Sequence, residues 1–99
     1  MITRIVKMQF HNDKLNEFFL LFDKINNKIS SFEGCHGMRL IQDESDPCIL
    51  FTYSVWEDSE ALDKYRNSDL FLKTWPIVKL LFSRKPEAWS CAERYNGFK

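Results

Sequence analysis

The stretch from Cys48 to Trp56 has the composition of a β-strand with no charged residue on either face. Side chains along a strand point alternately to its two faces. Here one face would carry Ile49, Phe51, Tyr53 and Val55, and the other Cys48, Leu50, Thr52, Ser54 and Trp56. A sheet containing this strand therefore has to be covered on both sides, because large uncharged patches are rarely left in water.

The segments before this strand predict a strand, a helix and a second strand. Residues Ile2 to Phe10 are strand-like, and the polar residues 11–13 that follow offer capping oxygens. Apolar residues then recur at three- and four-residue intervals, which predicts an amphipathic helix: Leu15, Phe18, Phe19, Phe22, Ile25 and Ile29. Gly34 and Gly37 mark a turn into a second strand that ends near Gln42, and the polar residues 43–47 form the turn of a hairpin.

The segments after this strand predict a helical region and a last strand. Residues 57–60 supply a capping side chain and acidic charge for a short helix, and Ser68 can cap a second helical segment. We expect Pro76 to break or kink that segment. Lys85-Pro86 should end the helical region, Glu87 to Tyr95 should form a strand, and the tail, residues 95–99, should fray.

The resulting order, β-α-β-β-α-β, predicts an α+β ferredoxin-like domain over residues 1–99, with a four-stranded antiparallel sheet and both helices on one face. The helices cover only one face of the sheet. We therefore expect a homodimer, in which two sheets stack face to face as an eight-stranded barrel wrapped by four helices.

Composition excludes several other classes of protein. Fourteen basic and fourteen acidic residues balance, so no positive field attracts nucleic acid. The longest apolar run, Phe18 to Phe22, is too short to span a membrane, and we expect neither a signal peptide nor an anchor. The cysteines at 35, 48 and 91 lack the close spacing of metal or redox motifs, which favours a reducing cytoplasm. A disulfide between two of them is the alternative.

The stretch Tyr53–Phe71 resembles the antibiotic biosynthesis monooxygenase family, in which a tryptophan, here Trp56, leads into a capped helix. The turn Glu33-Gly34-Cys35 and the pair Lys85-Pro86 also fit, so the likeness covers nearly the whole chain. The resemblance implies a dimeric α+β barrel that inserts oxygen into quinol-like aromatic substrates with O2 and without metal or flavin. The same barrel also serves isomerases, haem-degrading enzymes and ligand sensors.

The resemblance further implies a cavity between sheet and helices, lined by Trp56, Tyr65, Phe71 and Trp75. Aromatic rings stack well on a phenol, and the Tyr65 hydroxyl could polarise or orient it. The alternative is that these rings are simply core, since aromatic residues at helical spacing usually pack.

Oxygenation without a cofactor needs a base that makes the substrate anionic and a polar group that stabilises its oxyanion. The histidines are His11 and His36, and each is also typical of an exposed turn. A cation on a strand could point inward and hold a substrate oxyanion, and the candidates are Arg4, Lys7 and Arg39. We favour Arg39. The alternative is that Arg39 forms an ordinary salt bridge at the rim or between subunits.

Two departures from the family pattern bear on the activity. Many members carry a histidine in the helix after the tryptophan, where this chain has Tyr65. Haem-degrading relatives use a strand-one asparagine and a later histidine. Here strand one has no asparagine and Trp75 stands near the histidine position, so haem degradation is disfavoured.

These observations leave two functional hypotheses. The first is a monooxygenase without cofactor, with Tyr65, His36 and Arg39 as catalytic candidates and Trp56, Phe71 and Trp75 as the substrate-binding ones. The second is a non-catalytic domain that binds or senses a small ligand, which the scarcity of bases favours. RNA recognition is set aside, because the aromatic and basic strand signature of RNA-binding domains is missing and the net charge is zero.

Overall fold

The sheet is built around β1 (Ile2–Gln9), which pairs antiparallel with β3 (Ile49–Trp56) on one side and β4 (Glu87–Cys91) on the other. The second strand, β2 (Cys35–Gln42), pairs antiparallel with β3, so the strand order is β2-β3-β1-β4. The computed structural model describes residues 1–99. It confirms the predicted ferredoxin-like α+β fold.

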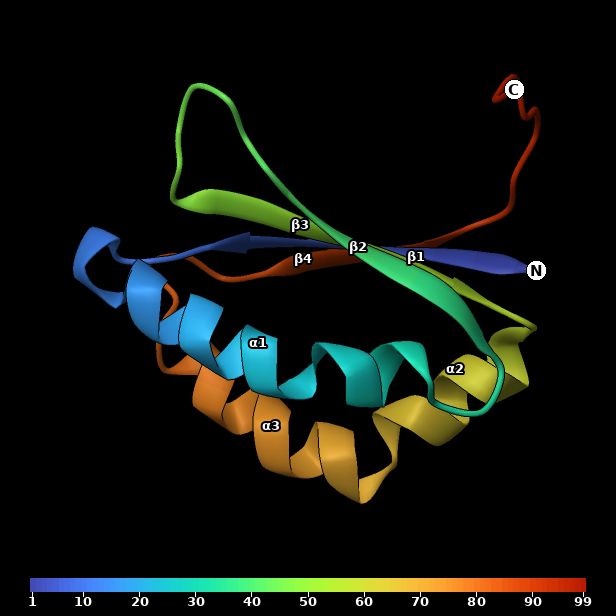
Figure 1. Cartoon of the computed structure of the whole chain (residues 1–99), viewed down its shortest axis with the longest axis horizontal. Helices are drawn as coiled ribbons and strands as arrows, with labels where there is room; N and C mark the ends of the chain where they lie inside the picture. Colours follow the sequence, from blue (N-terminus) through green and yellow to red (C-terminus); the bar gives the residue numbers. More distant parts are fainter.

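The helices lie together on one face of the sheet, as Figure 1 shows. They are α1 (Leu15–Ser30), preceded by the 3-10 turn η1 (Asn12–Lys14), and the pair α2 (Ser59–Arg66) and α3 (Asp69–Lys79). No helix is both long enough and apolar enough to cross a membrane.

Capping side chains fix where α2 and α3 begin. The carboxylate of Asp58 accepts a hydrogen bond from the backbone N–H of Ala61 at 2.8 Å, and the hydroxyl of Ser68 accepts one from Phe71 at 3.2 Å. Each bond satisfies a backbone N–H that has no partner within its own helix. The helical region is therefore divided into two helices between Arg66 and Asp69, as the predicted Ser68 cap requires.

Two local predictions need correction. Pro76 lies inside α3, which continues to Lys79, so the expected break of the helix does not occur there. The last strand ends at Cys91 and not at Tyr95, and the residues that follow Cys91 are exposed. His36 lies at the start of β2, at an irregularity of register between Cys35 and Gly37, and is exposed as expected.

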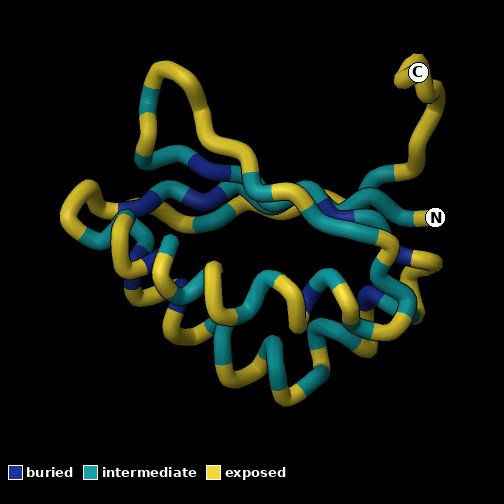
Figure 2. The backbone as a smooth tube through the Cα atoms, in the orientation of Figure 1, coloured by how far each residue is buried: buried dark blue, intermediate teal, exposed yellow.

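Many residues of the sheet are only partly buried (Figure 2), and the strand register places mostly apolar residues on the face away from the helices. The strand register places Ile5 beside Tyr53 on one side and beside Trp89 on the other, while Ile41 lies beside Phe51. Ile41 is 51% exposed and Trp89 is 46% exposed. We call this surface, formed by Ile5, Ile41, Phe51, Tyr53, Val55 and Trp89, the outer sheet face.

Candidate functional site

The buried core falls into two separate clusters between the sheet and the helices. One contains Met8, Phe10, Phe18, Leu50, Val78 and Leu81. The other contains Ile29, Trp56 and Leu62. The strand register explains the separation, because the pair Met8 and Leu50 and the pair Ile2 and Trp56 lie at opposite ends of the β1 and β3 ladder.

A cavity of about 210 Å³ lies between the two clusters. The residue pairs at this level of the ladder are Val6 with Thr52 and Arg4 with Ser54. Small hydroxyl side chains and a long cation stand here in place of the large apolar side chains that would fill the space. The middle of the core therefore stays open, at a volume somewhat below the roughly 300–1,000 Å³ of typical small-molecule sites.

One wall of the cavity is a continuous series of aromatic rings. Tyr65 stacks on Trp56 with ring centroids 4.9 Å apart and contacts Phe71 edge-on at 5.3 Å. Phe71 in turn stacks on Trp75 at 5.7 Å with an interplanar angle of 15°. All four residues line the cavity. The wall can hold a planar ring by stacking and edge contacts.

Tyr65 brings a hydroxyl group into this apolar wall. Burial, with a smaller contribution from Cys35, raises the pKa of Tyr65 to about 12. At neutral pH the hydroxyl is therefore protonated and can donate a hydrogen bond to a ligand. It cannot serve as a base there.

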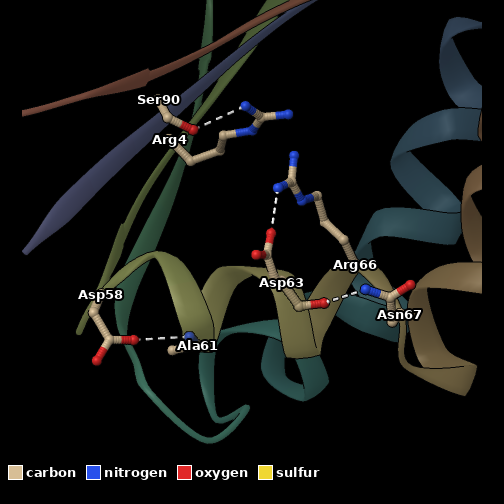
Figure 3. Close-up of polar contacts among 7 residues, drawn as sticks. All are labelled: Arg4, Asp58, Ala61, Asp63, Arg66, Asn67 and Ser90. Carbon is tan, nitrogen blue, oxygen red and sulfur yellow. Dashed lines mark hydrogen bonds and ion pairs between the residues drawn. The ribbon is translucent and has the colours of Figure 1, made fainter.

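Two arginines bring positive charge to the same cavity. Arg4 extends from β1 and donates a hydrogen bond from Nη1 to the Ser90 hydroxyl at 3.0 Å. Arg66, at the end of α2, pairs with Asp63. Figure 3 shows the guanidinium groups of Arg4 and Arg66 directed toward each other across the space between sheet and helix. Burial first, and then the charge of Arg66, lower the pKa of Arg4.

Four of the six residues predicted for the site line the cavity: Trp56, Tyr65, Phe71 and Trp75. Arg39 and His36 do not line it. Arg39 pairs in register with Tyr53 on the outer sheet face, so its side chain is directed away from the helices and is exposed. His36 is exposed, and its Nε2 contacts the carboxylate of Glu57 at the end of the sheet.

Arg4 takes the inward position that was expected of Arg39. The alternation of side chains along β1 could have predicted this position. Arg4 lies on the same face of the strand as Val6 and Met8, whose side chains also line the cavity. Arg66 was not considered from the sequence, because a basic residue in the last turn of a helix is ordinarily explained by the helix dipole.

The lining contains no His, Asp, Glu or Lys. Nowhere in the chain do three or more His, Cys, Asp or Glu side chains gather in a way that could hold a metal ion. Cys35 lies beside the cavity wall, and burial raises the pKa of its thiol, so it is not an activated thiolate. The chemistry that the cavity itself offers is stacking, hydrogen-bond donation and positive charge.

Known structures share this arrangement of sheet and helices. A conserved protein from Methanosarcina mazei superposes with a TM-score of 0.88 at 25% identity, covering 95% of this chain and 94% of its own. SnoaB from Streptomyces nogalater, described as a cofactor-independent oxygenase and solved as a point mutant, gives 0.87 at 16% identity, with 99% and 97% coverage. A structure described as an antibiotic biosynthesis monooxygenase gives 0.88 at 17%, with 94% and 98% coverage. No curated protein matches the sequence.

The protein is thus a ferredoxin-like domain with a cavity between its sheet and its helices. Residues 1–75 match the family model described as antibiotic biosynthesis monooxygenase. The chain belongs to that family.

Proposed function

We propose that the protein is a monooxygenase that acts on a small phenol- or quinol-type aromatic substrate in this cavity and uses O2 with neither metal nor flavin. The observation that carries the proposal is that one cavity combines an aromatic wall, a protonated tyrosine and an arginine without an acidic partner. Family membership supports the reaction type. The description of SnoaB as a cofactor-independent oxygenase supports the lack of a cofactor.

The cavity favours the anionic form of such a substrate without a conventional base. Positive charge near a phenol lowers the phenol's pKa, because it stabilises the phenolate. The Tyr65 hydroxyl can donate a hydrogen bond to the same oxyanion. The proton then leaves to solvent, and the electron-rich ring is ready to react with O2.

The reaction balances without a further reductant. The phenolate transfers an electron to O2, and the two radicals combine to form a C–O bond at the para carbon. Protonation gives a hydroperoxide. Loss of the para hydrogen as a proton and cleavage of the O–O bond then leave a carbonyl and release water. One oxygen atom enters the quinone, the other enters water, and the ring supplies all four electrons.

Oxygen uptake with 1-naphthol or anthrone tests this proposal, with quinone formation followed by absorbance against a blank without protein. Under 18O2 the quinone should gain one labelled oxygen atom. Tyr65→Phe should lower kcat by about 100-fold, as expected for loss of an oxyanion donor. Absence of both oxygen uptake and quinone above the blank would overturn the proposal.

Arg4→Gln and Arg39→Gln separate the two arginines considered for the oxyanion. We expect Arg4→Gln to slow quinone formation, because Arg4 lines the cavity. Loss of activity in Arg39→Gln, with Arg4→Gln unaffected, would restore the role that the sequence predicted for Arg39.

A non-catalytic ligand-binding domain is the second candidate. It is favoured by the lack of His, Asp, Glu and Lys in the cavity lining. Tight binding of 1-naphthol without oxygen uptake, and unaffected by Tyr65→Phe, would support this function over the enzyme.

We also propose that two copies pair through the outer sheet face and that the protein works in the cytoplasm. The partly exposed apolar side chains on that face support the pairing. The three free cysteines, Cys35, Cys48 and Cys91, are consistent with a reducing compartment.

A further inference from the structure

We propose that the ligand of the cavity is an aromatic monocarboxylate, whose ring lies against the aromatic wall and whose carboxylate is bound between Arg4 and Arg66. This inference rests on the proposed function for the identity of the site and adds the substrate class: the phenolic substrate also carries one carboxylate. The carboxylate lies beside Arg4 and Arg66, and the phenolic hydroxyl is left to Tyr65. It begins from the juxtaposition of two cations that extend from different elements of the fold toward one point (Figure 3).

Arg4 is the less satisfied of the two cations. Its hydrogen bond goes to the neutral hydroxyl of Ser90, and no carboxylate forms an ion pair with it. A guanidinium has five N–H donors, so most of the donors of Arg4 are free to bind a ligand. Two like charges directed at one another are unfavourable, and an anion between them would turn that repulsion into attraction.

The charge balance of the site favours one negative charge on the ligand. Asp63 already neutralises Arg66, and the lining contains no other acidic or basic residue apart from Arg4. The group of Arg4, Arg66 and Asp63 therefore has a net charge of about one positive unit. A monoanionic carboxylate matches that charge, while a phosphate dianion would exceed it. The planar fork of a guanidinium also suits the two oxygens of a carboxylate.

The positions of the charges also determine the orientation of the ligand. The Arg66 side chain is 40% exposed, so the charged end of the cavity is in contact with solvent. The rings of Trp56, Tyr65 and Phe71 form an apolar part of the cavity wall. A carboxylate left at the mouth keeps part of its hydration, while the ring of the same molecule is buried. This arrangement avoids the large cost of burying an isolated charge.

Binding of 2-naphthoate and of 2-naphthamide tests the inference, because the two probes share one ring system and differ in charge. Neither has a phenolic hydroxyl, so the measurement does not depend on the proposed oxygenation. Quenching of tryptophan fluorescence reports binding, since Trp56 and Trp75 line the cavity. We expect the carboxylate to bind about 10- to 100-fold more tightly than the amide, the range expected of charge-assisted hydrogen bonds.

Arginine variants locate the source of this preference. Arg4→Gln should reduce the ratio of the two affinities to near one, and Arg66→Gln should lower it. Arg84→Gln, at an exposed arginine outside the cavity lining, should leave the ratio unchanged. Equal affinity for both probes in the unmodified protein, failure of both to bind, or an unchanged ratio in Arg4→Gln would overturn the inference.

The two proposals fail separately. A preference for the carboxylate without oxygen uptake from any phenol would uphold the binding site and overturn the monooxygenase. Oxidation of 1-naphthol with equal binding of 2-naphthoate and 2-naphthamide would uphold the monooxygenase and overturn the carboxylate site.

Discussion

The ring of Tyr65 stacks on the indole of Trp56, with centroids 4.9 Å apart and an interplanar angle of 24°. This contact joins the end of β3 to the last turn of α2. It buries the Tyr65 ring while the residue lines the cavity. The same contact thus stabilises the fold and helps to determine the protonation state of a group beside the ligand.

Tyr65→Phe should change how stability depends on alkaline pH. Tyrosine ionises near pH 10 in the unfolded chain, and burial raises the pKa of Tyr65 to about 12 in the folded protein. The unfolded state therefore loses its proton first. The contribution is fully present below pH 10 and is lost as the pH rises toward 12. Relative to pH 8, the native protein should lose about 1.4 kcal/mol more than Tyr65→Phe by pH 11.

Urea unfolding of both proteins between pH 8 and pH 11 measures this difference. The other titrating groups are common to the two chains and cancel in the comparison. Parallel stability curves for the two proteins over this range would contradict the prediction.

Ser54→Ala should destabilise the protein more than Ser90→Ala, although both serines lie beside Arg4 in the sheet. The buried Ser54 hydroxyl accepts a hydrogen bond from Nε1 of Trp56 at 2.9 Å, whereas Ser90 is exposed. Removing the Ser54 acceptor leaves a buried indole N–H unpaired, at a cost of about 1–3 kcal/mol. Ser90→Ala should cost less than about 0.5 kcal/mol.

The free energy of unfolding in urea checks both serine variants. Ser54→Thr keeps the hydroxyl acceptor and should recover part of the loss. Equal effects of Ser54→Ala and Ser90→Ala would show that the hydrogen bond to Trp56 does not stabilise the fold.

The sequence predicted the fold from periodicity, and the family resemblance placed the aromatic residues at a cavity between sheet and helices. The spacing of Tyr65 and Phe71 around the two side-chain caps directs both rings to the cavity that Trp56 of β3 also lines. The positive end of the cavity was harder to predict. Arg4 and Arg66 are far apart in the chain, and their approach depends on how α2 packs against β3, the neighbour of β1, which no local pattern encodes.

The prediction that Arg39 points into the cavity shows a second limit of prediction from sequence. A strand pattern gives two alternating faces, but the face that the helices cover depends on the register with neighbouring strands. In β2 the irregularity between Cys35 and Gly37 shifts that register. Arg39 consequently lies opposite Tyr53 on the outer sheet face.

Gly34→Ala should destabilise the protein by about 2–4 kcal/mol, because conformational strain and overpacking both contribute to the cost. Gly34 has φ of 84°, which side chains other than glycine rarely adopt, and a Cβ there would lie 2.5 Å from Cβ of Ala61 in α2. Its carbonyl also accepts a hydrogen bond from the Glu57 N–H at 2.8 Å, so α2 and β2 would be displaced together.

Thermal and urea unfolding measure this effect, with Gly97→Ala as the matched substitution. Gly97 lies after the last strand, and a Cβ there comes no closer than 3.3 Å to a neighbouring atom, the Tyr95 hydroxyl. Gly97→Ala should stay within about 0.5 kcal/mol of the native protein. A similarly small effect of Gly34→Ala would mean that the turn before β2 can adopt another conformation.

Ile41→Asp should weaken the proposed pairing of two copies, whereas Ile77→Asp should not. The two isoleucines are both 51% exposed in the single chain, but Ile41 lies on the outer sheet face and Ile77 lies on α3. An aspartate on a face that is buried by a second copy must lose its hydration or separate the sheets, while one on a solvated helix surface costs little. Phe51→Asp, beside Ile41 in the sheet, should have the same effect as Ile41→Asp.

Analytical ultracentrifugation at micromolar concentration distinguishes these outcomes, with circular dichroism to show that each variant is folded. We expect the native protein and Ile77→Asp to sediment as dimers and the two outer-face variants to shift toward monomer. Because the cavity lies on the opposite side of the sheet, a folded Ile41→Asp monomer should still bind 2-naphthoate. A native protein that sediments as a monomer would show that the outer sheet face is covered in some other way.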